Sequence, residues 1–206
     1  MKSIHLAMIV VASALCLAAD PVADAVALYE AKRYPEAAAL LEKTIAESPG
    51  IRMDAYVHLL KCYSYLFDYT AMLRVSRQAL RISRKQYEVF YFKSYAHYYR
   101  GEYDAAFEEI QKAIALNSEN AFLYNFLGLI HLKKNELPPA AAAFASATQR
   151  ASWNPIYQNN AGDVYALQGN YQKAYEAYLK AASLDPESKT TARSNAARLA
   201  GLLKKQ

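Results

Sequence analysis

The sequence predicts an all-α fold in which pairs of helices stack one after another as an α-solenoid. Glycine and proline are scarce among the 206 residues, with six and seven copies, whereas helix-favouring alanine, leucine and lysine are plentiful. Features recur with a period of 34 residues, since Gly128 and Gly162 lie one period apart and Gly101 and Gly169 lie two. Each proline falls where a predicted helix begins or ends, at positions 21, 35, 49, 138, 139, 155 and 186.

Residues 1–18 are predicted to be a secretory signal. Lys2 gives a basic start, residues 4–17 are mainly apolar, and small residues follow at Ala18 and Ala19. This apolar run is shorter than the roughly 20 residues that a membrane-spanning helix needs. We therefore expect cleavage after Ala18, no transmembrane segment in the mature chain, and an exported protein located in the periplasm.

Cys16 allows another interpretation of this segment, in which a lipidated cysteine anchors the protein to a membrane. Bulky Leu15 stands where a lipidation motif has a small residue, which makes this alternative weaker. Cys62 is the only cysteine beyond the predicted signal. We therefore expect no disulfide within the mature chain.

Every period carries the same alternation of large and small residues. The position after the mid-unit turn is held by Tyr34, Tyr69, Tyr103, Leu137 and Tyr171. Two columns of mainly small residues follow, and between them lies a large position, held by Leu41, Ile110, Phe144 and Tyr178 and broken only by Ser76. Small residues let two helices approach closely, while the large residue fills the space between them and the next pair. Because one pair cannot bury its apolar stripe alone, the pattern predicts that the pairs stack.

This pattern resembles the tetratricopeptide repeat, and the run NNAGDVYALQGNYQKAYEAYLKAASLDP is close to that repeat over a whole unit. The resemblance covers residues 19–188, with units at about 18–52, 53–86, 87–120, 121–154 and 155–188. It implies a right-handed superhelix whose first helices line a concave groove. The second unit departs from the pattern at Met72, Ser76 and Arg84, and we expect it to be the most irregular.

Residues 189–206 are predicted to form a solvating helix that closes the stack. One face of this helix is apolar, formed by Ala192, Ala196, Leu199, Ala200 and Leu203. The basic residues of the segment lie largely elsewhere on the helix. A frayed basic tail is the alternative.

The sequence offers little support for catalysis. It has no Gly-rich phosphate loop, no serine in a nucleophile-elbow context and no His-Glu-x-x-His motif. His97 and His131 lie one period apart and are expected to be partly buried packing residues. His58 and Cys62 have a spacing that suits a metal, but no further ligands accompany them. We therefore expect no enzymatic activity, no cofactor and no metal site.

Charge also limits the partners. The chain has 24 basic and 19 acidic residues, an excess too small to predict nucleic-acid binding. Four arginines form a basic stripe on the predicted second helix of the second unit, namely Arg74, Arg77, Arg81 and Arg84. A solvated outer face is the expected role of this stripe, and contact with anionic lipid or an acidic protein is the alternative.

The resemblance implies that partners bind in the groove, and the repeat register gives its candidate residues: Lys61, Tyr91, Tyr95, Tyr98, Phe122, Asn125, Leu129, Asn159 and Asp163. Tyrosine suits an interface because it offers apolar area together with a hydroxyl group. The alternative for the tyrosines is packing between units. Asn125 and Asn159 lie one period apart and are expected to form a two-rung ladder of amides that can bond the backbone of an extended peptide.

The sequence thus predicts a non-enzymatic scaffold that binds a protein or an extended peptide in its groove within the cell envelope. A ligand-binding accessory of an envelope transport system, possibly oligomeric, is the second hypothesis. The third is an assembly subunit that packs through residues 22–28 at the amino-terminal end.

Overall fold

The computed structural model describes residues 20–48, 52–185 and 191–203, and the predicted signal with Cys16 lies outside this part. Eleven α-helices and no strand occur within these ranges. The helices are α1 (Pro21–Glu30), α2 (Tyr34–Glu47), α3 (Met53–Tyr65), α4 (Tyr69–Ile82), α5 (Tyr87–Tyr99), α6 (Tyr103–Leu116), α7 (Ala121–Lys133), α8 (Leu137–Arg150), α9 (Pro155–Leu167), α10 (Tyr171–Leu184) and α11 (Thr191–Leu203).

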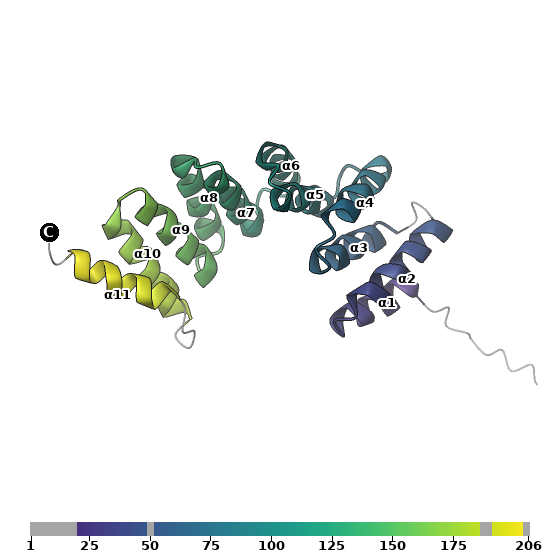
Figure 1. Ribbon diagram of the computed structural model, residues 1–206, viewed down its shortest axis with the longest axis horizontal. Helices are drawn as coiled ribbons and strands as arrows, with labels where there is room; N and C mark the ends of the chain where they lie inside the picture. The colour runs from purple at the N-terminus through teal and green to yellow at the C-terminus, as the bar shows by residue number, and fades with distance from the viewer. Residues whose placement is uncertain (1–19, 49–51, 186–190, 204–206) are drawn as a thin grey trace, which may run out of the picture.

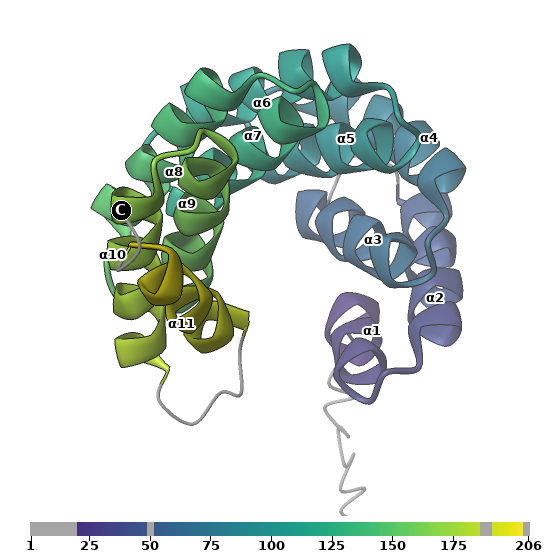
Figure 2. The ribbon, with the colours of Figure 1, turned by 60° about the vertical axis from the view of Figure 1, so that its left-hand side comes forward.

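Consecutive helices pack as antiparallel pairs, and each pair packs on the next (Figure 1). Figure 2 shows that the pairs together form an arch. The inner side of this arch is lined by α1, α3, α5, α7, α9 and α11, and the outer side by α2, α4, α6, α8 and α10. The α-solenoid predicted from the sequence is confirmed, and each predicted unit holds one helix pair.

Local sequence explains where the helices begin and turn. Side-chain oxygens of Asp20, Asp68 and Asn120 accept hydrogen bonds from backbone N–H groups in the first turns of α1, α4 and α7. The turn within each pair needs one residue with positive φ. Gly169 meets that need without strain between α9 and α10, whereas Phe67, with φ of 56°, holds the equivalent place in the second unit.

Close approach within the pairs depends on two small residues. A Cβ added at Gly128 would lie 2.6 Å from the Phe144 ring, and one added at Gly162 would lie 2.6 Å from the Tyr178 ring. Each ring therefore rests directly on the backbone of the partner helix. This contact buries both rings almost completely.

The second unit reverses this arrangement. Leu60 and Ser76 are its counterparts of Gly128 and Phe144, and both are fully buried. The large residue lies on the first helix here and the small one on the second. As a result α3 and α4 pack less closely than any other pair, although their lengths match those of the later units. The expected irregularity of this unit is thus present in the packing and absent from the helix boundaries.

The last described helix, α11, packs on α10 through Ala192, Ala196 and Leu199, which are buried. These residues repeat the buried positions 157, 161 and 164 of α9 at a spacing of 35, so α11 stands where the first helix of a further pair would stand. In the part of the chain that the structure describes, no helix combines the length and apolarity that crossing a membrane requires.

Replacing Gly162 with alanine should lower the free energy of unfolding by about 1–3 kcal/mol, because the new methyl group overlaps the Tyr178 ring. Gly201→Ala in α11 is the matched control. No atom lies within 4 Å of its Cβ position, so this change should leave stability equal or raise it by up to about 1 kcal/mol. Urea unfolding followed by circular dichroism measures both, and equal effects of the two variants would contradict the packing described.

Candidate functional site

The candidate groove residues lie on four inner helices that contact one another in series. Lys61 belongs to α3, the three tyrosines to α5, and Asn159 and Asp163 to α9. Phe122, Asn125 and Leu129 belong to α7, between α5 and α9. These residues therefore lie along one wall, and they differ greatly in how much of each side chain solvent can reach.

The tyrosines of α5 form an aromatic cluster with α7. Tyr91 lies edge-on to Phe122, with ring centroids 4.9 Å apart, and Tyr95 stacks on Phe126 at 5.9 Å. Tyr98 lies 5.3 Å from the same Phe126 ring. All three tyrosines are half-buried. Each one therefore packs between the third and fourth units and also leaves part of its side chain open to solvent. Burial raises the pKa of Tyr91 well above its usual value, which keeps its hydroxyl protonated.

Exposed aromatic area lies beside this cluster. The Phe122 side chain is 42% exposed and that of Tyr99 is 51% exposed. Tyr99 stacks on Tyr69 of α4 with centroids 5.3 Å apart, and Tyr65 stacks on Tyr34 of α2 at 4.5 Å in the same manner one unit earlier. We call Tyr65, Tyr95, Tyr99 and Phe122 the aromatic ledge. It extends over the inner helices α3, α5 and α7.

The asparagines pair differently from the prediction. Asn125 is 6% exposed, and its Oδ1 accepts a hydrogen bond of 2.8 Å from Nδ2 of Asn160. Asn125 is therefore closed to a peptide in the groove, and the expected two-rung ladder of Asn125 and Asn159 is wrong. Because Asn125 faces α9 inside the stack, burial requires it to bond a protein group, and Asn160 provides one. Asn159 instead donates to Asp163 Oδ2 at 3.2 Å, and its own Oδ1 is buried without a partner among the described residues.

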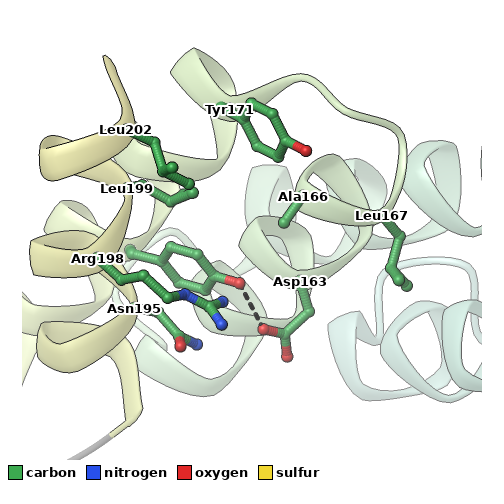
Figure 3. Close-up of a pocket in the computed structure, with 9 residues that line it drawn as sticks. Asp163, Ala166, Leu167, Tyr171, Asn195, Arg198, Leu199 and Leu202 are labelled. Carbon is green, nitrogen blue, oxygen red and sulfur yellow. Dashed lines mark hydrogen bonds between the residues drawn. The ribbon is translucent and has the colours of Figure 1, made fainter. Parts of the chain in front are cut away.

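Asp163 lines a cleft of about 500 Å³ between α9, α10 and α11. Its Oδ1 accepts a 2.7 Å hydrogen bond from the Tyr178 hydroxyl. Figure 3 shows Asn195 and Arg198 of α11 extending toward it from the opposite side. Burial raises the pKa of Asp163 above its ordinary value, although the Tyr178 hydrogen bond and the Arg198 charge act in the other direction. The cleft thus holds a carboxylate, a guanidinium and an amide beside the apolar Leu199 and Leu202.

Two further candidates have smaller roles. Leu129 is partly buried between two apolar clusters, one with α5 and α6 and the other with α8 and α9, so it serves mainly to join them. Lys61 is half-buried on α3, and no salt bridge to an acidic group of the described chain is formed. Its charge therefore remains available at the amino-terminal end of the wall.

The residues considered for metal or acid–base chemistry have structural contacts. His97 Nδ1 lies 2.5 Å from Glu102 Oε2, and His131 Nδ1 lies 2.6 Å from Glu136 Oε2 one period later. Burial raises the pKa of Cys62 to about 11, which disfavours the thiolate that a metal binds. Among the described residues, His, Cys, Asp and Glu side chains form no group of three or more that could hold a metal ion.

Sequence reasoning missed Phe126, Asn195 and Arg198 as parts of the wall. A usable signal exists for the last, because Arg198 stands 35 residues after Asp163 and so occupies its place on α11. The prediction that residues 189–206 form only a solvating helix left this correspondence between Arg198 and Asp163 unnoticed. Phe126 has no comparable signal, since periodicity alone does not separate a residue that supports a binding surface from one that packs within a unit.

Comparisons with known proteins agree with this architecture. The family model of the tetratricopeptide repeat matches residues 155–188, and a second model of the same repeat matches residues 93–155. TPR repeat-containing protein MJ1428 of Methanocaldococcus jannaschii is 30% identical over 87 residues, which are 42% of this chain and 15% of that protein. The chain spans between 15 and 24% of the length of the curated relatives that it matches.

Solved structures are similar over most of the chain. PilF of Pseudomonas aeruginosa aligns with a TM-score of 0.78 at 19% identity, covering 89% of this chain and 83% of that one. YrrB, described as a TPR protein with an unusual peptide-binding site, aligns with a TM-score of 0.64 at 22% identity, covering 90% and 91%. At these identities the likeness establishes the fold.

Asp163 should make stability depend on pH in a defined direction. A carboxyl group whose pKa is raised by folding binds its proton more tightly in the folded chain. The contribution of Asp163 to stability should therefore fall as the pH rises from the ordinary pKa of this carboxyl group, near 3.8, through its raised pKa. Asp163→Asn removes this dependence. Urea unfolding of both proteins at a series of pH values measures it. The account fails here if the wild-type protein gains stability relative to the variant as pH rises.

Proposed function

Because the chain belongs to the tetratricopeptide repeat family, we propose that it is a non-enzymatic scaffold that binds a protein or an extended peptide along the inner wall of its arch. The observation that carries this proposal is the aromatic ledge. Half-exposed aromatic rings follow one another over three inner helices, where the packing of a closed domain would have covered them.

The side chains of the inner wall suit the binding of an extended peptide segment better than the binding of a single small group. Tyr99 and Phe122 offer flat apolar area to alternate side chains of a partner, and the rings are held by stacking, so little rotamer freedom is lost on binding. At the carboxyl-terminal end, Asp163, Asn195 and Arg198 offer acceptors and donors for polar groups of the same segment. Lys61 offers a positive charge at the other end.

We further propose that the protein acts within the cell envelope, after export directed by residues 1–18. The support for this location is the sequence pattern of a basic start, an apolar run and small residues before position 19. Mass spectrometry of the mature protein from a fractionated native host tests it. Recovery from the envelope with an amino terminus at residue 19 is expected, and recovery of the uncleaved chain from the cytoplasmic fraction would refute it.

One observation favours a second function, the binding of a small ligand for an envelope transport system. The cleft at Asp163 and Arg198 has the volume that ligand pockets usually have, about 300–1,000 Å³, and combines apolar walls with a few polar groups. A molecule that carries both charges would suit it. Native mass spectrometry of the purified protein would favour this function if it revealed a small molecule that stays bound and is lost in Arg198→Ala.

The scaffold function is tested with peptides selected for binding to the purified protein from a random library. Tyr99→Ala and Phe122→Ala should each weaken the selected peptide about tenfold or more, because exposed aromatic side chains at the centre of an interface contribute most of its affinity. Fluorescence polarisation with the labelled peptide measures the change.

Leu179→Ala is the matched control for this experiment. Leu179 is similarly exposed but lies on the outer helix α10, so its truncation should leave peptide affinity within about twofold. Circular dichroism confirms that each variant retains its helices. Equal losses at Leu179 and at the aromatic ledge, or no loss at either, would show that the inner wall is not the binding surface.

A further inference from the structure

A second polar site lies away from the inner wall, at the junction of α4, α5 and α6 (Figure 1). A cavity of about 290 Å³ occurs there. Leu80 lines it from α4, Arg84 from the connection between α4 and α5, Phe90 and Lys93 from α5, and Glu109 and Lys112 from α6. Four of these six residues are ionisable. This is an unusual lining for a gap between packed helices, where apolar contacts are the rule.

Glu109 is the central group of this junction. Its side chain is only 7% exposed, and its Oε1 accepts hydrogen bonds of 2.9 Å from both Lys93 Nζ and Lys112 Nζ. Its Oε2 is also buried but has no hydrogen-bond partner among the described residues. Burial acts to raise the pKa of Glu109, and the hydrogen bonds from Lys93 and Lys112 outweigh it, so that the pKa is lowered. The second oxygen is therefore a charged acceptor that lacks a donor.

The balance of charge around the cavity is positive. Arg84, Lys93 and Lys112 face a single carboxylate, which leaves an excess of two positive charges. Arg84 forms no ion pair with any described residue, unlike Arg74 of the same basic stripe, which bonds Glu42 Oε1 at 2.6 Å. A ligand that satisfied this site would carry about two negative charges and would also bring one hydrogen-bond donor for Glu109.

We propose that this junction binds the hydrogenphosphate ion, which carries two negative charges and keeps one P–OH. The unprotonated oxygens accept from Arg84, Lys93 and Lys112, and the P–OH donates to Glu109 Oε2. A carboxylate that repels a fully deprotonated anion attracts one that carries its own proton. The site therefore discriminates by protonation and excludes sulfate, which has the same charge and shape but no O–H group at neutral pH.

Isothermal titration calorimetry of the purified protein near pH 7, at ionic strength held constant with chloride, tests this proposal. Inorganic phosphate should bind saturably with one site and at least about tenfold more tightly than sulfate, because sulfate leaves the charged acceptor without a donor. O-phosphoserine is a second comparison ligand: the second pKa of a phosphomonoester is about 6, so near pH 7 its phosphate is mostly a dianion without a P–OH. Like sulfate, it should therefore bind at least about tenfold more weakly than inorganic phosphate.

Variants distinguish phosphate binding at this site from nonspecific phosphate binding to a basic surface. Arg84→Ala should weaken phosphate binding about tenfold, whereas Arg77→Ala, the same loss of charge on α4 but outside the cavity, should change it less than twofold. Glu109→Gln should bring the affinities for phosphate and sulfate close together, because an amide can present either an oxygen or an N–H group. Thermal unfolding shows whether this buried variant folds, and the arginine variants provide the test if it does not.

Three outcomes would overturn the proposal: no saturable phosphate binding, equal affinity for sulfate in the wild-type protein, or equal losses in Arg77→Ala and Arg84→Ala. None of these results bears on the aromatic ledge, because the two sites share no residue. The peptide experiment therefore stands or fails independently of this one.

Discussion

Inside each helix pair, a buried residue of the first helix is matched in size with a buried residue 16 positions later on the second, and this matching is the constraint on which the rest of the structure depends. All of these residues are buried, and their sizes compensate one another. The five pairs are Ala25 with Leu41, Leu60 with Ser76, Ser94 with Ile110, Gly128 with Phe144, and Gly162 with Tyr178. In the units where the first residue is glycine, the second is an aromatic residue whose ring rests on the glycine backbone. In these two units the helices thereby approach closely, with the ring against the glycine backbone.

The same constraint explains why the two proposed binding sites lie on different surfaces. Each pair presents one helix inward and one outward, and stacking repeats that choice along the arch (Figure 2). Residues that the stack does not need remain available on the inner helices, where Tyr99 and Phe122 keep exposed rings. The junctions between pairs form a different environment. Arg84, Lys93 and Glu109 meet at one of them, between the second unit, whose own helices pack least closely, and the third. The inner wall proposed to bind a peptide chain and the junction proposed to bind a small anion thus both arise from one repeated geometry.

Sequence periodicity sufficed for the architecture, because the 34-residue spacing of Gly128 and Gly162 reflects one glycine–ring contact that the fourth and fifth units share. It placed the candidate residues on the correct helices but could not assign their partners. Asn125 bonds Asn160 rather than continuing a ladder, since the choice depends on the rotation of α9 against α7, which no local pattern encodes. The environment of Asp163 likewise arises from Arg198 and Tyr178, which belong to two other helices. The unpaired oxygen of Glu109 could not be foreseen, because it depends on atomic positions that three helices set together.

A double-mutant cycle in the fourth unit tests the compensation of sizes most directly. Gly128→Leu places a large residue against the Phe144 ring, and Phe144→Ser leaves a cavity, so each change alone should destabilise the protein. Together they reproduce the arrangement of Leu60 and Ser76 in the second unit. Urea unfolding of the four proteins should show that the double variant loses less stability than the sum of the two single losses, by about 1–3 kcal/mol. Strictly additive losses would contradict the account.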